Sequence, residues 1–143
     1  MKKVIGLALG ALIFTLSVSA DAQQTGKIFR IGFLDSSTAS GMAVLVDAFR
    51  QEMSGLGWLE GKKFTIEDRF AEQKPERLPE LAAELVRLKV DLILVSGAPT
   101  ALAAKGATPT IPIVMANAAD PVGLGLIASL ARPGGNVTGL TGF

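Results

Sequence analysis

The residues best suited to chemistry in this sequence are small or polar, and they follow short apolar segments. The candidate ligand-binding residues are Ser36, Ser37, Ser96, Gly97, Thr100 and Asn117. Hydroxyl groups and the free backbone N–H groups at a helix start are hydrogen-bond donors that suit an anionic group such as a carboxylate. The chemistry indicated is reversible binding of a small molecule, and we assign no catalytic residue.

Three of these candidates, Ser96, Gly97 and Thr100, lie in the segment 90–100, VDLILVSGAPT, around which the rest of the fold is predicted. Leu92–Val95 is a continuous apolar run, which is typical of a strand covered on both faces of a parallel sheet. Gly97 allows close approach of backbone or ligand, and Pro99 suits the first turn of a helix. An anion at such a helix start gains only about 0.3–2 kcal/mol, whereas micromolar binding needs about 8 kcal/mol. We therefore expect a second binding surface that this sequence does not contain.

The composition excludes several classes of function. The sequence has no Cys and no His, which removes disulfides, thiolate nucleophiles, His bases and metal sites built from these residues. It contains no P-loop pattern, no G-x-G-x-x-G after the first strand and no G-x-S-x-G elbow. Acidic and basic residues are equal in number outside residues 1–22, so nothing favours a nucleic-acid partner. We assign no cofactor and no metal.

Residues 1–22 have the features of a secretory signal peptide, which we expect to form a helix before the domain. A basic start is followed by the apolar run Val4–Val18 and by the small-x-small pattern Ala20-Asp21-Ala22. We expect cleavage after Ala22, with Ala20 as the alternative. The apolar run is shorter than the roughly 20 residues of a membrane span, and no Cys follows it for lipid attachment. The mature chain, residues 23–143, should not be embedded in a membrane.

Strand and helix patterns alternate along the rest of the chain. Strands are predicted at 29–34, 64–70, 91–96, 111–115 and 136–140, and helices at about 41–54, 75–88, 99–106 and 122–131. This alternation predicts an α/β fold, with a parallel sheet that carries helices on both faces. Ligands of such sheets bind beyond the carboxyl ends of the strands, which is where all the candidate residues fall.

Individual residues predict where some of these elements begin and end. We expect Ser40 to cap the first helix and Gly55 and Gly57 to end it. Pro112 should lie near the start of its strand, since a proline inside the strand would remove a ladder hydrogen bond. Asp120 is expected to cap the fourth helix, over 122–131.

Short segments spread along the chain also form an ordered set that is specific as a whole. They are Ile31–Leu34, Gly57–Gly61, Glu76–Leu78, Ala82–Val86, Thr110–Val114, Asp120–Val122 and Ala131–Gly139. Together they resemble the periplasmic substrate-binding proteins of ABC transporters, in particular the group with members that take up aromatic amino acids. The resemblance covers essentially all of residues 28–142.

The resemblance implies a two-lobed binding protein of the first type, with the ligand held between the lobes. Residues 23–143 would be the N-terminal lobe, and the second lobe is absent. The implied ligand is an amino acid or similar carboxylate, the implied partner is an ABC transporter permease, and the implied location is the periplasm. Two alternatives stay open: an exported α/β enzyme of unknown reaction, and the ligand-sensing domain of a regulator.

Overall fold

The computed structural model describes residues 26–142, so the predicted signal peptide lies outside the described residues. The elements are β1 (Phe29–Asp35), α1 (Ala39–Gly55), β2 (Phe64–Phe70), the 3₁₀ turn η1 (Pro75–Arg77), α2 (Leu78–Arg87), β3 (Leu92–Val95), α3 (Ala98–Ala107), β4 (Ile113–Ala118) and β5 (Val137–Thr141). Each predicted strand is present. No helix among the described residues has the length and apolar character needed to cross a bilayer.

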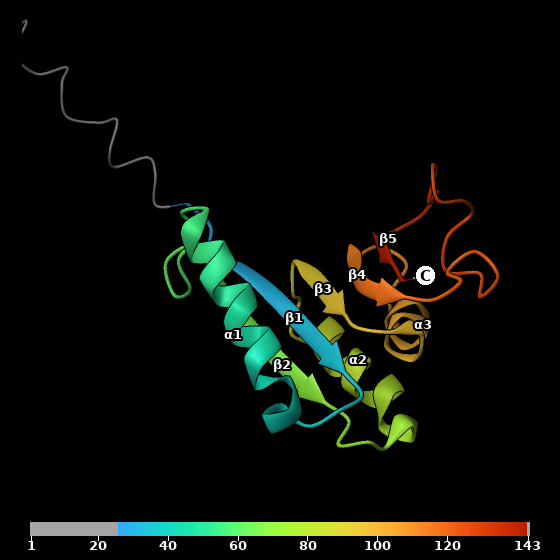
Figure 1. Cartoon of the computed structure of the whole chain (residues 1–143), viewed down its shortest axis with the longest axis horizontal. Coiled ribbons are helices and arrows are strands. Elements are labelled where there is room, and N and C mark those ends of the chain that lie inside the picture. The colour runs from blue at the N-terminus through green and yellow to red at the C-terminus, as the bar shows by residue number, and fades with distance from the viewer. Residues whose placement is uncertain (1–25, 143) are drawn as a thin grey trace, which may run out of the picture.

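The strands form one parallel sheet in the order β2-β1-β3-β4-β5. Helix α1 lies on one face of the sheet, and α2 and α3 lie on the other (Figure 1). The predicted fold class is therefore confirmed. The face assignment follows from right-handed crossovers, because the chain moves outward from β1 to β2 and then in the opposite direction from β2 through β3 to β4.

The two faces of the sheet differ in how well they are covered. Leu34, Ile93 and Val95 are fully buried beneath α2 and α3. The opposite face packs against α1 through a smaller cluster of Phe33, Met42 and Val46, with the half-buried Ile66, Phe70 and Leu94 beside it. The strand at the centre of the sheet is consequently buried on one face and half-buried on the other, which is less than its apolar sequence predicts.

Helix α1 begins and ends at identifiable residues. The hydroxyl of Thr38, not that of Ser40, accepts a hydrogen bond from Gly41 N at 3.0 Å, so the helix starts at Ala39 and Ser40 lies in its first turn. At the other end, Gly57 has φ +81° and donates to Ser54 O at 2.9 Å, as expected for a glycine that ends a helix. The N-cap of α1 is therefore Thr38, two residues before the predicted Ser40.

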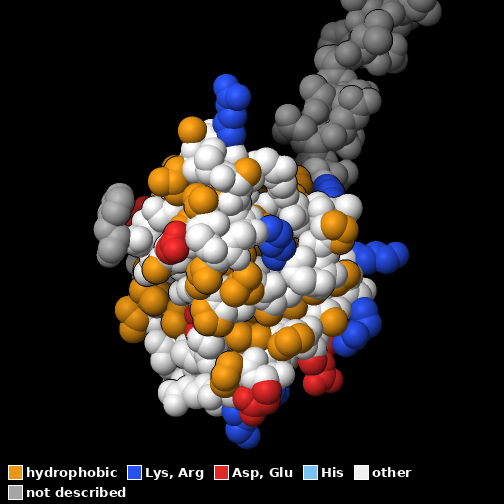
Figure 2. All heavy atoms as spheres, turned by 90° about the vertical axis from the view of Figure 1, so that its right-hand side faces the viewer, with side chains coloured by type: hydrophobic (Ala, Val, Ile, Leu, Met, Phe, Trp, Pro, Cys, Tyr) orange, Lys and Arg blue, Asp and Glu red, His pale blue; other side chains and the backbone are white. Residues whose placement is uncertain are grey.

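The predicted helix at 122–131 is absent, and the connection from β4 to β5 is a series of turns. Asp120 has φ +44°, and its carboxylate accepts from Gly123 N at 3.0 Å, which closes a turn in place of a helix start. Gly125, at φ +69°, turns the chain again. Of the apolar residues in this segment, Leu126 and Ile127 are buried in the core while Val122 and Leu124 are exposed, and Figure 2 shows apolar side chains spread over this side of the molecule.

The start of β1 is held to the start of β3 by Asp91. Its carboxylate accepts from Arg30 N at 2.9 Å and forms an ion pair with Lys27. The backbone hydrogen bond from Arg30, and then the bond from Lys27, hold the pKa of Asp91 below its ordinary value. Because the folded pKa is depressed, this stabilisation is present above the ordinary pKa near 4 and is lost as pH falls through the folded value.

We expect Asp91→Asn to lower the free energy of unfolding by about 1 kcal/mol at pH 7, because a charge-assisted acceptor is lost. The difference from the wild type should shrink as pH falls below about 4. Urea unfolding between pH 7 and pH 3 measures it, with Asp47→Asn as the matched control at an exposed acid whose surface ion pair with Arg50 contributes little. A difference independent of pH would contradict the assigned role.

Candidate functional site

The carboxyl ends of the strands meet at one edge of the sheet, which we call the rim. It consists of Asp35–Thr38, Ala71–Lys74, Ser96–Ala98 and Asn117. Parallel strands bring these segments together, since β1 lies between β2 and β3, and β4 lies beside β3. The sequence-predicted residues Ser36, Ser37, Ser96, Gly97 and Asn117 therefore lie on one side of the molecule, and Thr100 lies directly below them in α3.

The loop after β1 is ordered by a buried carboxylate. Asp35 is 4% exposed, and its Oδ1 accepts from the backbone N of Ser37 at 2.7 Å and from the Ser37 hydroxyl at 2.5 Å. The hydroxyl of Ser37 is thus used within the loop. The Ser36 hydroxyl has no hydrogen-bond partner among the described residues, and it is the group at this position that is free to bind a ligand.

The loop after β2 belongs to the rim, which the sequence interpretation missed. Glu72 N donates to Ser37 O at 3.0 Å, and Gln73 N donates to Ser36 O at 2.8 Å. Both Glu72 and Gln73 are non-glycine residues in the left-handed region, at φ +54° and +60°. Such backbone is costly and persists where surrounding contacts enforce it. The rule that places ligands beyond parallel strands applies equally to β2 and could have identified this loop.

The turn after β3 is shaped by backbone contacts with β4. Gly97 has φ +86°, and its N–H donates to Asn117 O at 2.6 Å. Thr100 is fully buried, and its hydroxyl donates to Ser96 O at 2.6 Å and to Gly97 O at 2.9 Å. The Gly97 amide and the Thr100 hydroxyl are therefore engaged in holding the turn.

Several donors remain at the rim once these internal bonds are counted. No side chain caps the start of α3, so the amides of its first turn, which include Ala98, have no intrahelical acceptor. The Ser96 hydroxyl and the exposed Asn117 amide also have no partner among the described residues. Ser36, Ser96, Ala98 and Asn117 thus offer uncharged donors along one edge, which can bind an anionic group without a lysine or arginine.

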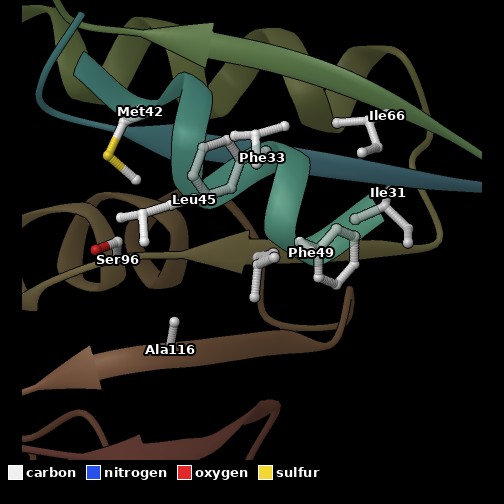
Figure 3. A pocket seen from close by; sticks show the side chains of 10 residues that line it. Ile31, Phe33, Met42, Leu45, Phe49, Ile66, Ser96 and Ala116 are labelled. Atoms are coloured by element: carbon white, nitrogen blue, oxygen red, sulfur yellow. The ribbon is translucent and has the colours of Figure 1, made fainter. Parts of the chain in front are cut away.

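An apolar pocket adjoins the rim. Its volume is about 280 Å³, and it lies between α1 and the sheet. The lining residues are Ile31, Phe33, Met42, Leu45, Val46, Phe49, Ile66, Leu94, Ser96 and Ala116. Figure 3 shows Ser96 at one end of the pocket near Met42 and Leu45, with Ile31 and Phe49 at the other end. Polar donors of the rim and apolar surface therefore lie next to each other.

The described residues include no arrangement that suggests a metal centre. Within residues 26–142, no group of three or more Asp, Glu, His or Cys side chains is placed to hold a metal ion.

Asn136, which begins the glycosylation-like sequence Asn136-Val137-Thr138, uses its side-chain amide inside the fold. It donates to Thr108 O at 3.1 Å and to Ile111 O at 2.9 Å. This asparagine orders the approach to β5.

Comparison with known protein families identifies the family of this chain. Residues 36–142 match the ABC transporter substrate binding protein family. This chain belongs to that family. The family predicted from the sequence segments is thereby confirmed, and the matched region contains every rim residue except Asp35.

Known relatives of this ABC substrate-binding protein include proteins that bind aromatic amino acids. A tyrosine-binding protein of Clostridioides difficile (strain R20291) is 36% identical over 95 residues, which is 66% of this chain and 28% of the relative. A Streptococcus pneumoniae ABC domain in complex with L-Trp superposes with a TM-score of 0.72 at 25% identity, covering 80% of this chain and 39% of that one.

Two further solved structures share the fold. The ligand-free, open structure of a Clostridium difficile substrate-binding protein with adhesive properties gives a TM-score of 0.74 at 28% identity, covering 81% of this chain and 39% of that one. A conserved domain protein from Vibrio cholerae gives 0.74 at 30% identity, covering 80% and 39%. The present chain thus spans well under half the length of these relatives.

Proposed function

We propose that this substrate-binding protein binds an aromatic or similar apolar amino acid between its rim and a second lobe. The observation that carries the proposal is the set of uncharged donors from Ser36, Ser96, Ala98 and Asn117 along one edge of the sheet. These donors suit an α-carboxylate, and the tyrosine-binding and L-Trp-bound relatives support the aromatic class.

A second surface is required on energetic grounds. An anion at a helix start contributes about 2 kcal/mol at most, while a micromolar complex needs about 8 kcal/mol. A ligand enclosed on both sides loses its contact with water, which strengthens each hydrogen bond to the rim. The relatives are much longer than this chain, which is consistent with a second lobe that closes over the ligand.

The proposed setting is import across a bacterial membrane. The protein would be exported by the signal peptide at residues 1–22, bind its solute in the periplasm and deliver it to an ABC permease. We infer that it performs no chemistry on the solute, because the family and its relatives are substrate-binding proteins and the Ser37–Asp35 hydroxyl–carboxylate pair at the rim is used to order its own loop.

Ser96→Asp should weaken amino-acid binding by about tenfold or more, because the new carboxylate lies at the rim and repels the ligand carboxylate. Isothermal titration of the whole two-lobed protein against L-Trp, L-Tyr and L-Phe measures the affinity. Ser54→Asp, at an exposed position near the end of α1 away from the rim, is the matched control and should leave the affinity unchanged.

Two results would count against the proposal. Equal affinity of the Ser96→Asp variant and the wild type would move the anion site away from α3. No heat with any amino acid or other small carboxylate would remove the ligand class itself, even though the family assignment would stand.

A further inference from the structure

The end of the sheet opposite the rim carries an exposed cluster of apolar and basic side chains, which we call the basal patch. It consists of Lys27, Ile28, Phe29, Leu56, Trp58, Leu59, Lys62 and Lys63. Leu56 is 75% exposed, and the other four apolar residues are between 37% and 46% exposed. These residues come from the start of β1 and from the connection between α1 and β2, which lie side by side at this end of the sheet (Figure 1).

The aromatic and basic groups of the basal patch are interleaved. The rings of Phe29 and Trp58 lie 5.8 Å apart between centroids, tilted by 50°. Lys27 Nζ lies 5.3 Å from the centre of the Phe29 ring, and Lys63 Nζ lies 5.7 Å from that of Trp58. Each ring therefore has an ammonium group over it, and the patch presents apolar faces with positive charge at their edges.

Glu60 and Asp91 near the patch are already paired, whereas Glu52 in the last turn of α1 has no ion-pair partner among the described residues. Glu60 accepts from Arg50 Nε at 2.7 Å, and Asp91 accepts from Arg30 N and pairs with Lys27. Lys62 and Lys63 have no ion-pair partner among the described residues. The patch thus keeps uncompensated positive charge beside exposed rings.

This combination fits a lipid headgroup region better than a protein surface. The centre of a protein interface is depleted of charged residues, whereas lysines run through the basal patch. Aromatic rings with a polar partner, together with lysines whose stems are apolar, are typical of side chains at a membrane interface. Positive charge then adds attraction to anionic lipids.

The position of the patch in the chain points the same way. Lys27 and Ile28 follow closely on the predicted signal peptide, whose apolar run, Val4–Val18, is the segment that enters the membrane during export. The basal patch therefore begins within a few residues of the predicted cleavage site. The rim, at the opposite end of the strands, stays free.

We propose that the basal patch binds reversibly to a membrane surface that contains anionic phospholipid. The proposal depends on export but not on ligand binding, so its failure and the failure of the amino-acid site are distinguishable. Trp58 is the only tryptophan of residues 1–143, so the fluorescence of this chain reports on the patch.

The experiment uses the exported chain purified from cells, with its N-terminus defined by mass spectrometry. Phosphatidylglycerol–phosphatidylcholine vesicles should shift Trp58 emission to the blue, and brominated lipid should quench it. Pure phosphatidylcholine vesicles should give a shift several times smaller, and added salt should reduce the binding to anionic vesicles.

Variants separate the apolar contribution to vesicle binding from the electrostatic one while keeping Trp58 as the probe. Leu56→Ser, and Lys62→Gln combined with Lys63→Gln, should each lower the vesicle affinity about threefold or more, with circular dichroism confirming the fold. Leu130→Ser and Arg77→Gln change exposed residues outside both the patch and the rim and should have no effect.

Several outcomes would overturn the proposal. These are no vesicle-dependent shift, equal binding to neutral vesicles, or equal losses in the patch and control variants. A Trp58 shift that vesicles fail to produce but a purified protein partner does would assign the surface to that partner instead.

Discussion

Gly139→Val is expected to detach β5 from the sheet and to lower the free energy of unfolding by about 3 kcal/mol or more. Gly139 pairs with Met115 of β4 and has φ +136°, a conformation that other residues rarely adopt. A Cβ at this position would lie 2.2 Å from the backbone O of Met115 and 2.5 Å from its N. The obstacle is backbone of the neighbouring strand, so no side-chain rotation relieves it.

Gly135→Val is the matched control for this substitution. A Cβ on Gly135 meets nothing within 4 Å, although the residue lies only a few positions before β5. Urea unfolding compares the stabilities, and amide hydrogen exchange of Val137–Thr141 reports whether β5 stays paired. Similar stabilities for the two variants would show that β4 and β5 are not in the register described.

Phe64→Ala should produce the largest loss among core truncations, about 3–5 kcal/mol. Phe64 is the largest of the fully buried side chains, and its ring meets that of Phe49 edge-on at 6.2 Å between centroids. It lies where α1 packs on β2. Truncation leaves a cavity that the sheet and the helix cannot both collapse to fill.

Phe29→Ala provides the comparison, because Phe29 is the register partner of Phe64 on β1 but is 41% exposed. We expect a loss of about 1 kcal/mol, since much of this side chain already contacts water. Thermal and urea unfolding of both variants give the values. Equal losses would mean that α1 does not cover the start of β2.

The strands could be predicted from sequence because each is a short apolar run between turn residues. Pro112 also marked the start of β4 correctly, since that strand begins at Ile113. The predicted end of this strand, at Met115, was too early, because β4 continues to Ala118. Ala116–Ala118 extends the strand by pairing with β5 across an irregularity, and the apolar pattern that identifies a strand stops at Met115.

The prediction of a helix at 122–131 was wrong because it followed the apolar pattern and left out the backbone preferences of single residues. The apolar spacing after Pro121 suits a helix, yet Gly123 and Gly125 interrupt it, and Asp120 uses its carboxylate to close a turn. Local hydrogen bonding by Asp competes with helix formation in this way. Helix α2, which has a charged outer face and an uninterrupted apolar stripe, was predicted well.

The location of the candidate site could be predicted, but which of its polar groups are already used in hydrogen bonds within the fold could not. Parallel topology places Ser36, Ser96 and Asn117 at one edge regardless of detail. The bond from Gly97 N to Asn117 O joins residues far apart in the chain, and burial of the Thr100 hydroxyl depends on how α3 packs. Neither has a signature in the local sequence.

The loops of the rim are joined to one another through main-chain atoms, between Glu72–Gln73 and Ser36–Ser37, and between Gly97 and Asn117. Main-chain bonds do not depend on which side chain a residue carries. Mutation can therefore exchange the groups presented to a solute while the scaffold beneath them keeps its shape. Under the proposed function, homologous substrate-binding proteins can diverge in the ligand they bind by a few substitutions at these positions, with little cost in folding.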